Sequence, residues 1–197
     1  FLGTFLRTAE YDKFNYKFYL GFDSNDKFFI TLQEQFKKKI KITDKIIILE
    51  GCNGNPCKAW NILADEALKD NCTYLYQIGD DIKMLSYIVG GVDSRFYSER
   101  IVKSSPIIEN AFMHKNNFLL YPVLFNEKLK NWFSDDWLTN VWYSLAVIVP
   151  QIRYFNSNRV AGTNELSRYT PEDKCEWVKW LKEDLGIIED NISKYDL

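Results

Sequence analysis

The chain of 197 residues is 46% hydrophobic and 26% charged, an ordinary composition for one globular domain. Its net charge of -2 does not attract a phosphate backbone or an anionic membrane, so nucleic acid is not an expected partner. No apolar run approaches the roughly 20 residues that span a bilayer, and four cysteines beside one histidine form no zinc pattern. We therefore expect reduced thiols, no transmembrane segment and a cytoplasmic protein.

The first predicted elements alternate between strand and helix. Residues 17–22 are expected to form a strand that ends at a polar turn over 23–26. A helix is predicted over 28–38. The continuous apolar run 46–49 is typical of a strand covered on both faces of a parallel sheet.

The next predicted helix has a recognisable start. Asn55 precedes Pro56, and apolar residues recur at helical spacing over 60–68, so Asn55 is the expected N-cap and Pro56 the first helical residue. A strand over 73–78 follows and delivers Gly79-Asp80-Asp81 at its carboxyl end. This alternation predicts an α/β fold with a mostly parallel sheet flanked by helices.

The pattern is less regular after the acidic pair. A strand is predicted over 87–92, too close to Ile82 for a parallel crossover, which needs about 10 to 12 residues. We therefore expect a segment to be missing near 84–86. The remaining predicted elements are a strand over 109–114, a helix over 135–146 and a last helix over 171–185.

The pair Asp80-Asp81 is the first candidate site. Adjacent carboxylates after a buried strand repel each other unless a cation offsets their charge. Mg²⁺ and Mn²⁺ take one or two protein carboxylates and complete their octahedron with phosphate oxygens and water, which suits a nucleoside diphosphate. The carboxyl edge of a parallel sheet is also where α/β folds bind ligands. The residues alone leave open a solvated turn in which Asp81 caps a helix.

A second acidic pair, Asp135-Asp136, opens a predicted helix between Trp132 and Trp137. Negative charge is favoured at a helix start, so capping alone explains one acid. A carboxylate beside aromatic side chains can also have its pKa raised toward the value that a general base needs. The pair is therefore either a general base or a helix cap over a tryptophan-rich core.

Four further residues are candidates for ligand contacts. His114, the one histidine, follows a predicted strand and is either structural or a metal ligand. Asn55, Lys58 and Asn61 gather at a helix start, which can face an anion, and Lys58 and Asn61 share one helix face. A capped helix with a solvated lysine is the alternative, and for Asn55 it is the preferred interpretation.

Four segments, in this order, resemble the nucleotide-sugar half of the A-type fold (GT-A) glycosyltransferases, and in particular a subgroup from protists and large DNA viruses. They are residues 51–61, 74–82, 112–114 and 131–137. Gly79-Asp80-Asp81 stands where that family carries its Asp-x-Asp metal motif. The resemblance covers roughly 16–142 and implies one GT-A domain over 1–197, with the family's first strand falling ahead of Phe1.

The resemblance implies a metal-dependent transfer of sugar from a nucleotide-diphosphate donor to a hydroxyl of a glycan or another acceptor. Mn²⁺ or Mg²⁺ would be the cofactor. Asp81 would be the principal metal contact, and His114 would complete the metal shell. Asp80 would lie at the metal or nearer the donor ribose, and Asp23 would approach the nucleoside. Asn55, Lys58 and Asn61 would also face the donor.

Asp135 or Asp136 would then be the general base that takes the proton from the acceptor hydroxyl as it attacks the anomeric carbon. The metal would stabilise the departing diphosphate. We expect inversion at this carbon, with retention as the alternative, because no residue fixes which face of the sugar is attacked. Two rival functions are a nucleotidyltransferase and a catalytically silent sugar-binding module with the same fold.

Overall fold

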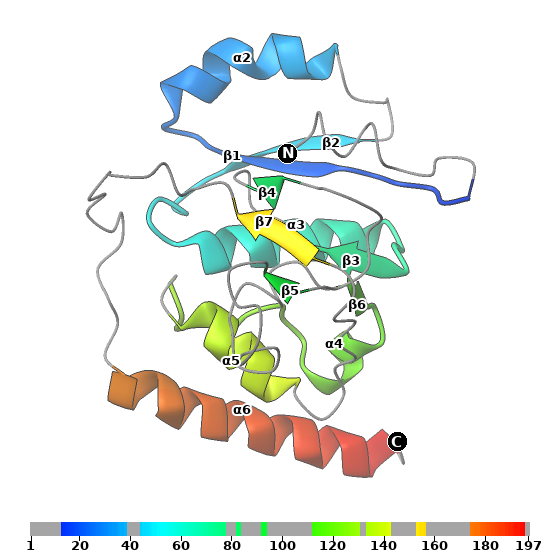
Figure 1. Cartoon of the computed structure of the whole chain (residues 1–197), viewed down its shortest axis with the longest axis vertical. Coiled ribbons are helices and arrows are strands. Elements are labelled where there is room, and N and C mark those ends of the chain that lie inside the picture. Colours follow the sequence, from blue (N-terminus) through cyan, green and yellow to red (C-terminus); the bar gives the residue numbers. More distant parts are fainter. Residues whose placement is uncertain are drawn as a thin grey trace.

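The computed structural model describes residues 13–38, 44–77, 82–83, 92–93, 112–130, 133–142, 153–156 and 174–195 (Figure 1). The strands are β1 (Tyr19–Asp23), β2 (Lys45–Leu49), β3 (Tyr74–Tyr76), β4 (Ile82–Lys83), β5 (Val92–Asp93), β6 (Phe112–His114) and β7 (Arg153–Asn156). The helices are α2 (Lys27–Lys37), α3 (Pro56–Lys69), α4 (Asn117–Leu120), α5 (Ser134–Val141) and α6 (Lys174–Tyr195).

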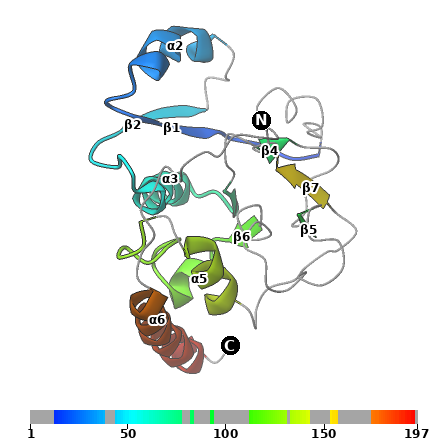
Figure 2. The same cartoon turned by 60° about the vertical axis from the view of Figure 1, so that its left-hand side comes forward.

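The first two strands form a parallel pair that lies between two helices. Gly21 is opposite Ile47, and Asp23 is opposite Leu49. α2 lies on one side of the pair and α3 on the other (Figures 1 and 2). A Cβ at Gly21 would lie 2.8 Å from Leu49 Cδ1 and 3.1 Å from Leu63 Cδ1. A larger residue at position 21 would therefore press on the ends of the Leu49 and Leu63 side chains, and glycine avoids this contact.

The remaining described strands make a mixed arrangement. β3 pairs antiparallel with β6, and β7 lies between β4, to which it is antiparallel, and β5, to which it is parallel. The α/β class is confirmed, but the mostly parallel sheet is not seen among the described strands. Along β3, Tyr74 is exposed and Leu75 is buried, an alternation that is common in antiparallel strands with one face in water.

The main core lies between α3, α5, α6 and the segment 120–129. Its most deeply buried side chains are Trp137, Phe125, Leu129 and Cys57. Trp137 and Trp142 are also buried there, since large aromatic side chains gain much from burial. Among the described residues, Cys52, Cys57 and Cys72 form no disulfide.

The last helix is longer than the sequence pattern predicted. α6 continues through Gly186 to Tyr195, ten residues beyond the expected end. Ile188 is buried in the core, and Asn191 Nδ2 donates to the Leu120 carbonyl at 2.9 Å. These tertiary contacts offset the low helix propensity of glycine. The predicted first residues of this helix, 171–173, lie outside the described residues.

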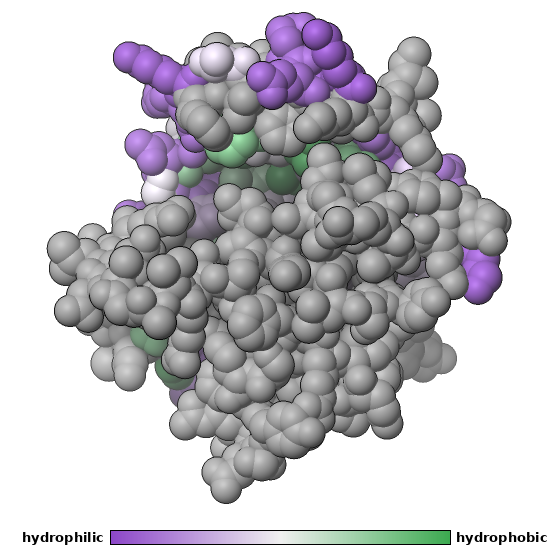
Figure 3. All heavy atoms as spheres, turned by 45° about the horizontal axis from the view of Figure 1, so that its top comes forward, coloured by the Kyte–Doolittle hydropathy of each residue, from purple (hydrophilic) through white to green (hydrophobic). Residues whose placement is uncertain are grey.

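The described surface is polar over α2. Figure 3 shows hydrophilic residues gathered on this helix, above a narrow apolar strip. Across the described ranges, no helix combines the length and the hydropathy that crossing a bilayer requires.

Candidate functional site

The parallel pair β1–β2 delivers two connecting segments to one edge. The Ser24 N–H donates to the Leu49 carbonyl at 2.9 Å, so the turn after β1 stays beside the loop after β2. An open hollow lies at this carboxyl edge. It is lined by Asp23, Asn25, Asp26, Lys27 and Asn53. The structure thus places the predicted nucleoside contact Asp23 in a hollow, with polar neighbours from both connections.

Hydrogen bonds of Asp23 and Asp26 hold the turn after β1. The Asp26 N–H donates to the Asp23 carbonyl at 3.0 Å, and Asp26 Oδ1 accepts from the Phe29 N–H at 3.3 Å, which begins α2. The hollow therefore presents two carboxylates, two carboxamides and one ammonium group. Carboxylates accept hydrogen bonds from hydroxyl groups, carboxamides both donate and accept, and an ammonium group only donates.

The loop between β2 and α3 turns sharply at two glycines. Gly51 and Gly54 have φ values of 63° and 70°, which glycine adopts without strain. Asn55 Oδ1 accepts from the Lys58 N–H at 3.0 Å, and Pro56 starts the helix, as predicted. The Lys58 ammonium donates to the Gly51 carbonyl at 3.2 Å, so this exposed cation turns back along the loop.

The end of β1 and the start of α3 lie close together. Asp23 is on the same face of β1 as Gly21, which packs on α3. Burial raises the pKa of the Cys52 thiol; the Lys58 charge lowers this pKa and the Asp23 charge raises it. Asp23 and Lys58 therefore both act on Cys52, and the predicted donor contacts Asp23, Asn55 and Lys58 share one region.

Asn61 has a different environment. Its Nδ2 donates to the Phe125 carbonyl at 2.8 Å, and its Oδ1 accepts from the Phe125 N–H at 2.8 Å. Both ends of the amide are thus bound to one buried residue. Asn61 joins α3 to the segment 120–129, and its expected contact with a donor stays a prediction.

His114 ends β6 and lies opposite Tyr74, at the beginning of β3. Its Nδ1 accepts from the Asn116 N–H at 3.2 Å, and the Tyr74 ring meets the imidazole edge-on at 5.0 Å. Asp80 and Asp81, which follow the other end of β3, lie outside the described residues. The described part of the chain contains no group of three metal-ligating side chains.

The second acidic pair lies in the first turn of α5. The helix begins at Ser134, one residue before the predicted start, and Phe133 occupies the N-cap position. Asp135 and Asp136 are therefore the second and third helical residues. The side chain of Asp135 lies outside the described set, and that of Asp136 is half-buried.

A buried polar network beneath α5 was not predicted. Asp184 of α6 is 4% exposed. Its Oδ1 accepts from the Tyr121 hydroxyl at 2.8 Å, and its Oδ2 accepts from Asn126 Nδ2 at 2.6 Å and Trp137 Nε1 at 2.8 Å. Burial, together with the Asp184 carboxylate, raises the pKa of Tyr121. The sequence did contain a signal for this network. Asp184 is spaced from Trp177 and Ile188 so that it falls on the apolar face of the helix, where an acid needs buried partners.

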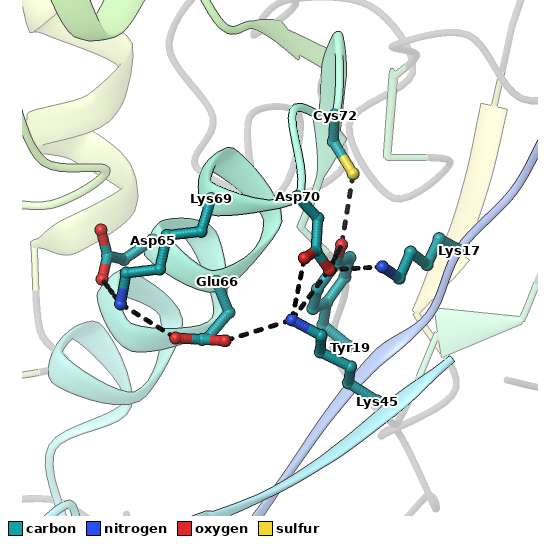
Figure 4. A network of polar contacts seen from close by, with 8 residues as sticks. All are labelled: Lys17, Tyr19, Lys45, Asp65, Glu66, Lys69, Asp70 and Cys72. Carbon is teal, nitrogen blue, oxygen red and sulfur yellow. Dashed lines mark hydrogen bonds and ion pairs between the residues drawn. The ribbon is translucent and has the colours of Figure 1, made fainter. Parts of the chain in front are cut away.

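A charged network lies at the opposite end of α3 (Figure 4). The Asp70 carboxylate accepts from Lys17 Nζ, from the Tyr19 hydroxyl at 2.7 Å and from Lys45 Nζ at 3.0 Å. These three donors hold the pKa of the Asp70 carboxyl well below its usual range. Burial, Cys72 and Asp70 raise the pKa of Tyr19. The network joins the beginnings of β1 and β2 to the end of α3.

Comparisons of the chain with protein-family models, curated protein sequences and solved structures find no match. The resemblance to A-type glycosyltransferases therefore rests on the four sequence segments.

Proposed function

We propose that the protein is a metal-dependent glycosyltransferase of the GT-A type, which moves a sugar from a nucleotide-diphosphate donor to an acceptor hydroxyl with inversion. One observation carries the proposal. The parallel strands β1 and β2 bring a polar hollow and the capped start of α3 to the same carboxyl edge. Ligands of open α/β folds bind at this edge, which is also where the sequence resemblance puts the donor.

The hollow has the chemistry that a nucleoside requires. The Asp23 and Asp26 carboxylates accept hydrogen bonds from ribose hydroxyls and base N–H groups, while Asn25 and Asn53 both donate and accept. The start of α3 and the Lys58 ammonium are favourable for the negative charge of the diphosphate. Donor recognition is therefore assigned to these residues, and the acceptor side to the acids of α5.

The metal is assigned to Asp81, with Asp80 beside it. Mn²⁺ or Mg²⁺ bound there would neutralise the charge that develops on the departing diphosphate. His114 stays the predicted third ligand. It lies opposite the first residue of β3, and its Nδ1 accepts from the Asn116 N–H at 3.2 Å.

Proton transfer is assigned to Asp135 or Asp136. A carboxylate in the first turn of α5 serves as the base if it reaches the acceptor hydroxyl at hydrogen-bond distance. General-base catalysis contributes about 10²- to 10⁴-fold to a rate. Asp135→Asn and Asp136→Asn, compared one at a time, identify the base as the substitution that lowers kcat by this amount.

The decisive experiment incubates purified protein with a panel of nucleotide-diphosphate sugars, with Mn²⁺, with Mg²⁺ and with excess chelator. Asp81→Ala is expected to abolish metal-dependent transfer or donor hydrolysis. Asp65→Ala, which removes an exposed acid of α3, is the matched control and should retain activity. Full activity in excess chelator contradicts the metal assignment. In a parallel incubation with a nucleoside triphosphate and a sugar phosphate, release of pyrophosphate would indicate a nucleotidyltransferase. Calorimetry without metal-dependent nucleotide binding would indicate a silent module.

A further inference from the structure

The helical turn that carries the second acidic pair is held at both ends by α6. At one end, the Phe133 ring stacks on Trp177, with 5.4 Å between centroids and 10° between planes. At the other end, Trp137 Nε1 donates to Asp184 Oδ2 at 2.8 Å. Trp177 and Asp184 are seven residues apart, two helical turns, and therefore lie on one face of α6. Asp135 and Asp136 lie between the two anchors.

The Phe133 anchor includes an unfavourable backbone conformation. Phe133 has φ 62° and ψ 5°, in the left-handed region, and its side chain caps no α5 N–H group. A residue other than glycine stays in this region only where its surroundings determine the conformation. The stacked Trp177 ring is such a surrounding, because it fixes the direction of the Phe133 side chain.

The Trp137 anchor is fully enclosed. Trp137 is 0% exposed, and the centroid of its ring lies 5.4 Å from that of Tyr121. Its backbone N–H donates to the Phe133 carbonyl at 2.7 Å. Asp184 receives further hydrogen bonds from Tyr121 and Asn126. The indole therefore cannot turn without breaking the contact with Asp184 and disturbing the core.

We propose that α6 positions the acidic pair of α5, with Asp184 acting through Trp137 and Trp177 acting through Phe133. The inference rests on the proposed function, because it concerns the general base of that reaction. A general base works only within hydrogen-bond reach of the proton that it removes, and a displacement of about 1 Å can cost roughly 10²-fold in rate. Asp184 and Trp177 are thus positioning residues that do not touch the substrate.

The test compares two substitutions at Asp184. In Asp184→Asn, the side-chain carbonyl can accept from Trp137 and Asn126 while the amide donates to the Tyr121 hydroxyl, so the anchor is preserved. Asp184→Ala removes it. We expect Asp184→Ala to lower kcat by about 10²-fold with little change in the donor KM, and Asp184→Asn to restore kcat. Ile187→Ala, at an exposed position of the same helix, is the control.

Phe133 supplies a second pair of variants in case Asp184→Ala does not fold. Phe133→Gly accepts the left-handed backbone but loses the ring stack, whereas Phe133→Tyr keeps both the strain and the stack. We expect Phe133→Gly to lower kcat and Phe133→Tyr to preserve it. NMR of the Trp137 indole N–H reports the anchor independently: its slow hydrogen exchange should persist in Asp184→Asn and be lost in Asp184→Ala.

The outcomes separate this inference from the proposed function. An inactive wild-type protein overturns both. In an active protein, an unchanged kcat in Asp184→Ala or, where that variant does not fold, in Phe133→Gly overturns the positioning role alone. Equal loss of kcat in Asp184→Asn and Asp184→Ala also overturns it, because the charge rather than the geometry would then matter.

Discussion

Replacing Asn61 with alanine should destabilise the protein rather than weaken donor binding alone. The Asn61 amide donates to the Phe125 carbonyl and accepts from the Phe125 N–H, both at 2.8 Å. Phe125 is 1% exposed, so water does not readily replace either bond. Each buried polar group left without a partner costs about 1–3 kcal/mol. The two groups together lower the free energy of unfolding by roughly 3 kcal/mol.

Such a loss is large beside a total stability of about 5–15 kcal/mol. In a chain of this length it corresponds to a decrease in Tm of about 6–12 °C. Urea unfolding, followed by tryptophan fluorescence, measures the change through the midpoint at constant m value. The matched control is Asn53→Ala, an exposed position on the hollow, which should change stability by less than about 0.5 kcal/mol.

The reasoning about Asn61 fails if Asn61→Ala unfolds at the wild-type midpoint. If that variant also loses nucleotide binding while Asn53→Ala retains it, Asn61 serves the donor and not the fold. Loss of stability in Asn61→Ala, with nucleotide affinity reduced only in Asn53→Ala, supports the structural role.

Three further predictions concern the elements around the site. Asn55→Ala should cost about 1 kcal/mol in urea unfolding, and Asn55→Gly only a few tenths, because glycine is a tolerated N-cap. Gly21→Ala should cost about 1–3 kcal/mol, since its Cβ would press on Leu49 and Leu63; a neutral result would show that α3 moves away freely. The pKa of Asp70 is lower in the folded than in the unfolded state, so its contribution to stability is present above the unfolded pKa, near 4, and is lost as pH falls below it. In Asp70→Asn, the urea midpoint of unfolding should therefore fall less steeply as the pH is lowered through the acidic range. The same pH dependence as in the wild type would contradict this assignment.

Much of the candidate site follows from local signals. Apolar runs identify β1 and β2, and polar turns end them. Asn55 before Pro56 predicts the start of α3, because capping depends on residues three or fewer positions apart. Parallel strands bring their carboxyl ends to one edge, which is why the turn after β1 lies beside the loop that leads into α3.

Tertiary structure decided the features that depend on distant partners. Among the described strands, β3 pairs with β6 and not with β1 or β2, a choice between distant segments that the local sequence does not encode. Asn61, which the sequence predicted only as a donor contact beside Lys58, also bonds a residue 64 positions away. Hydrogen bonds between segments so far apart leave no periodic pattern in the chain.

The two acidic pairs also show what is local in the sequence and what depends on the fold. Both pairs were predicted from the residues alone, because adjacent carboxylates after a strand or at a helix start are a local signal; Asp80 and Asp81 lie outside the described residues. That Asp135 and Asp136 lie between Phe133 and Trp137, each anchored on α6, is visible only in the folded chain. The extension of α6 through Gly186 has the same origin, because burial of Ile188 offsets a helix propensity that the sequence pattern took as an end.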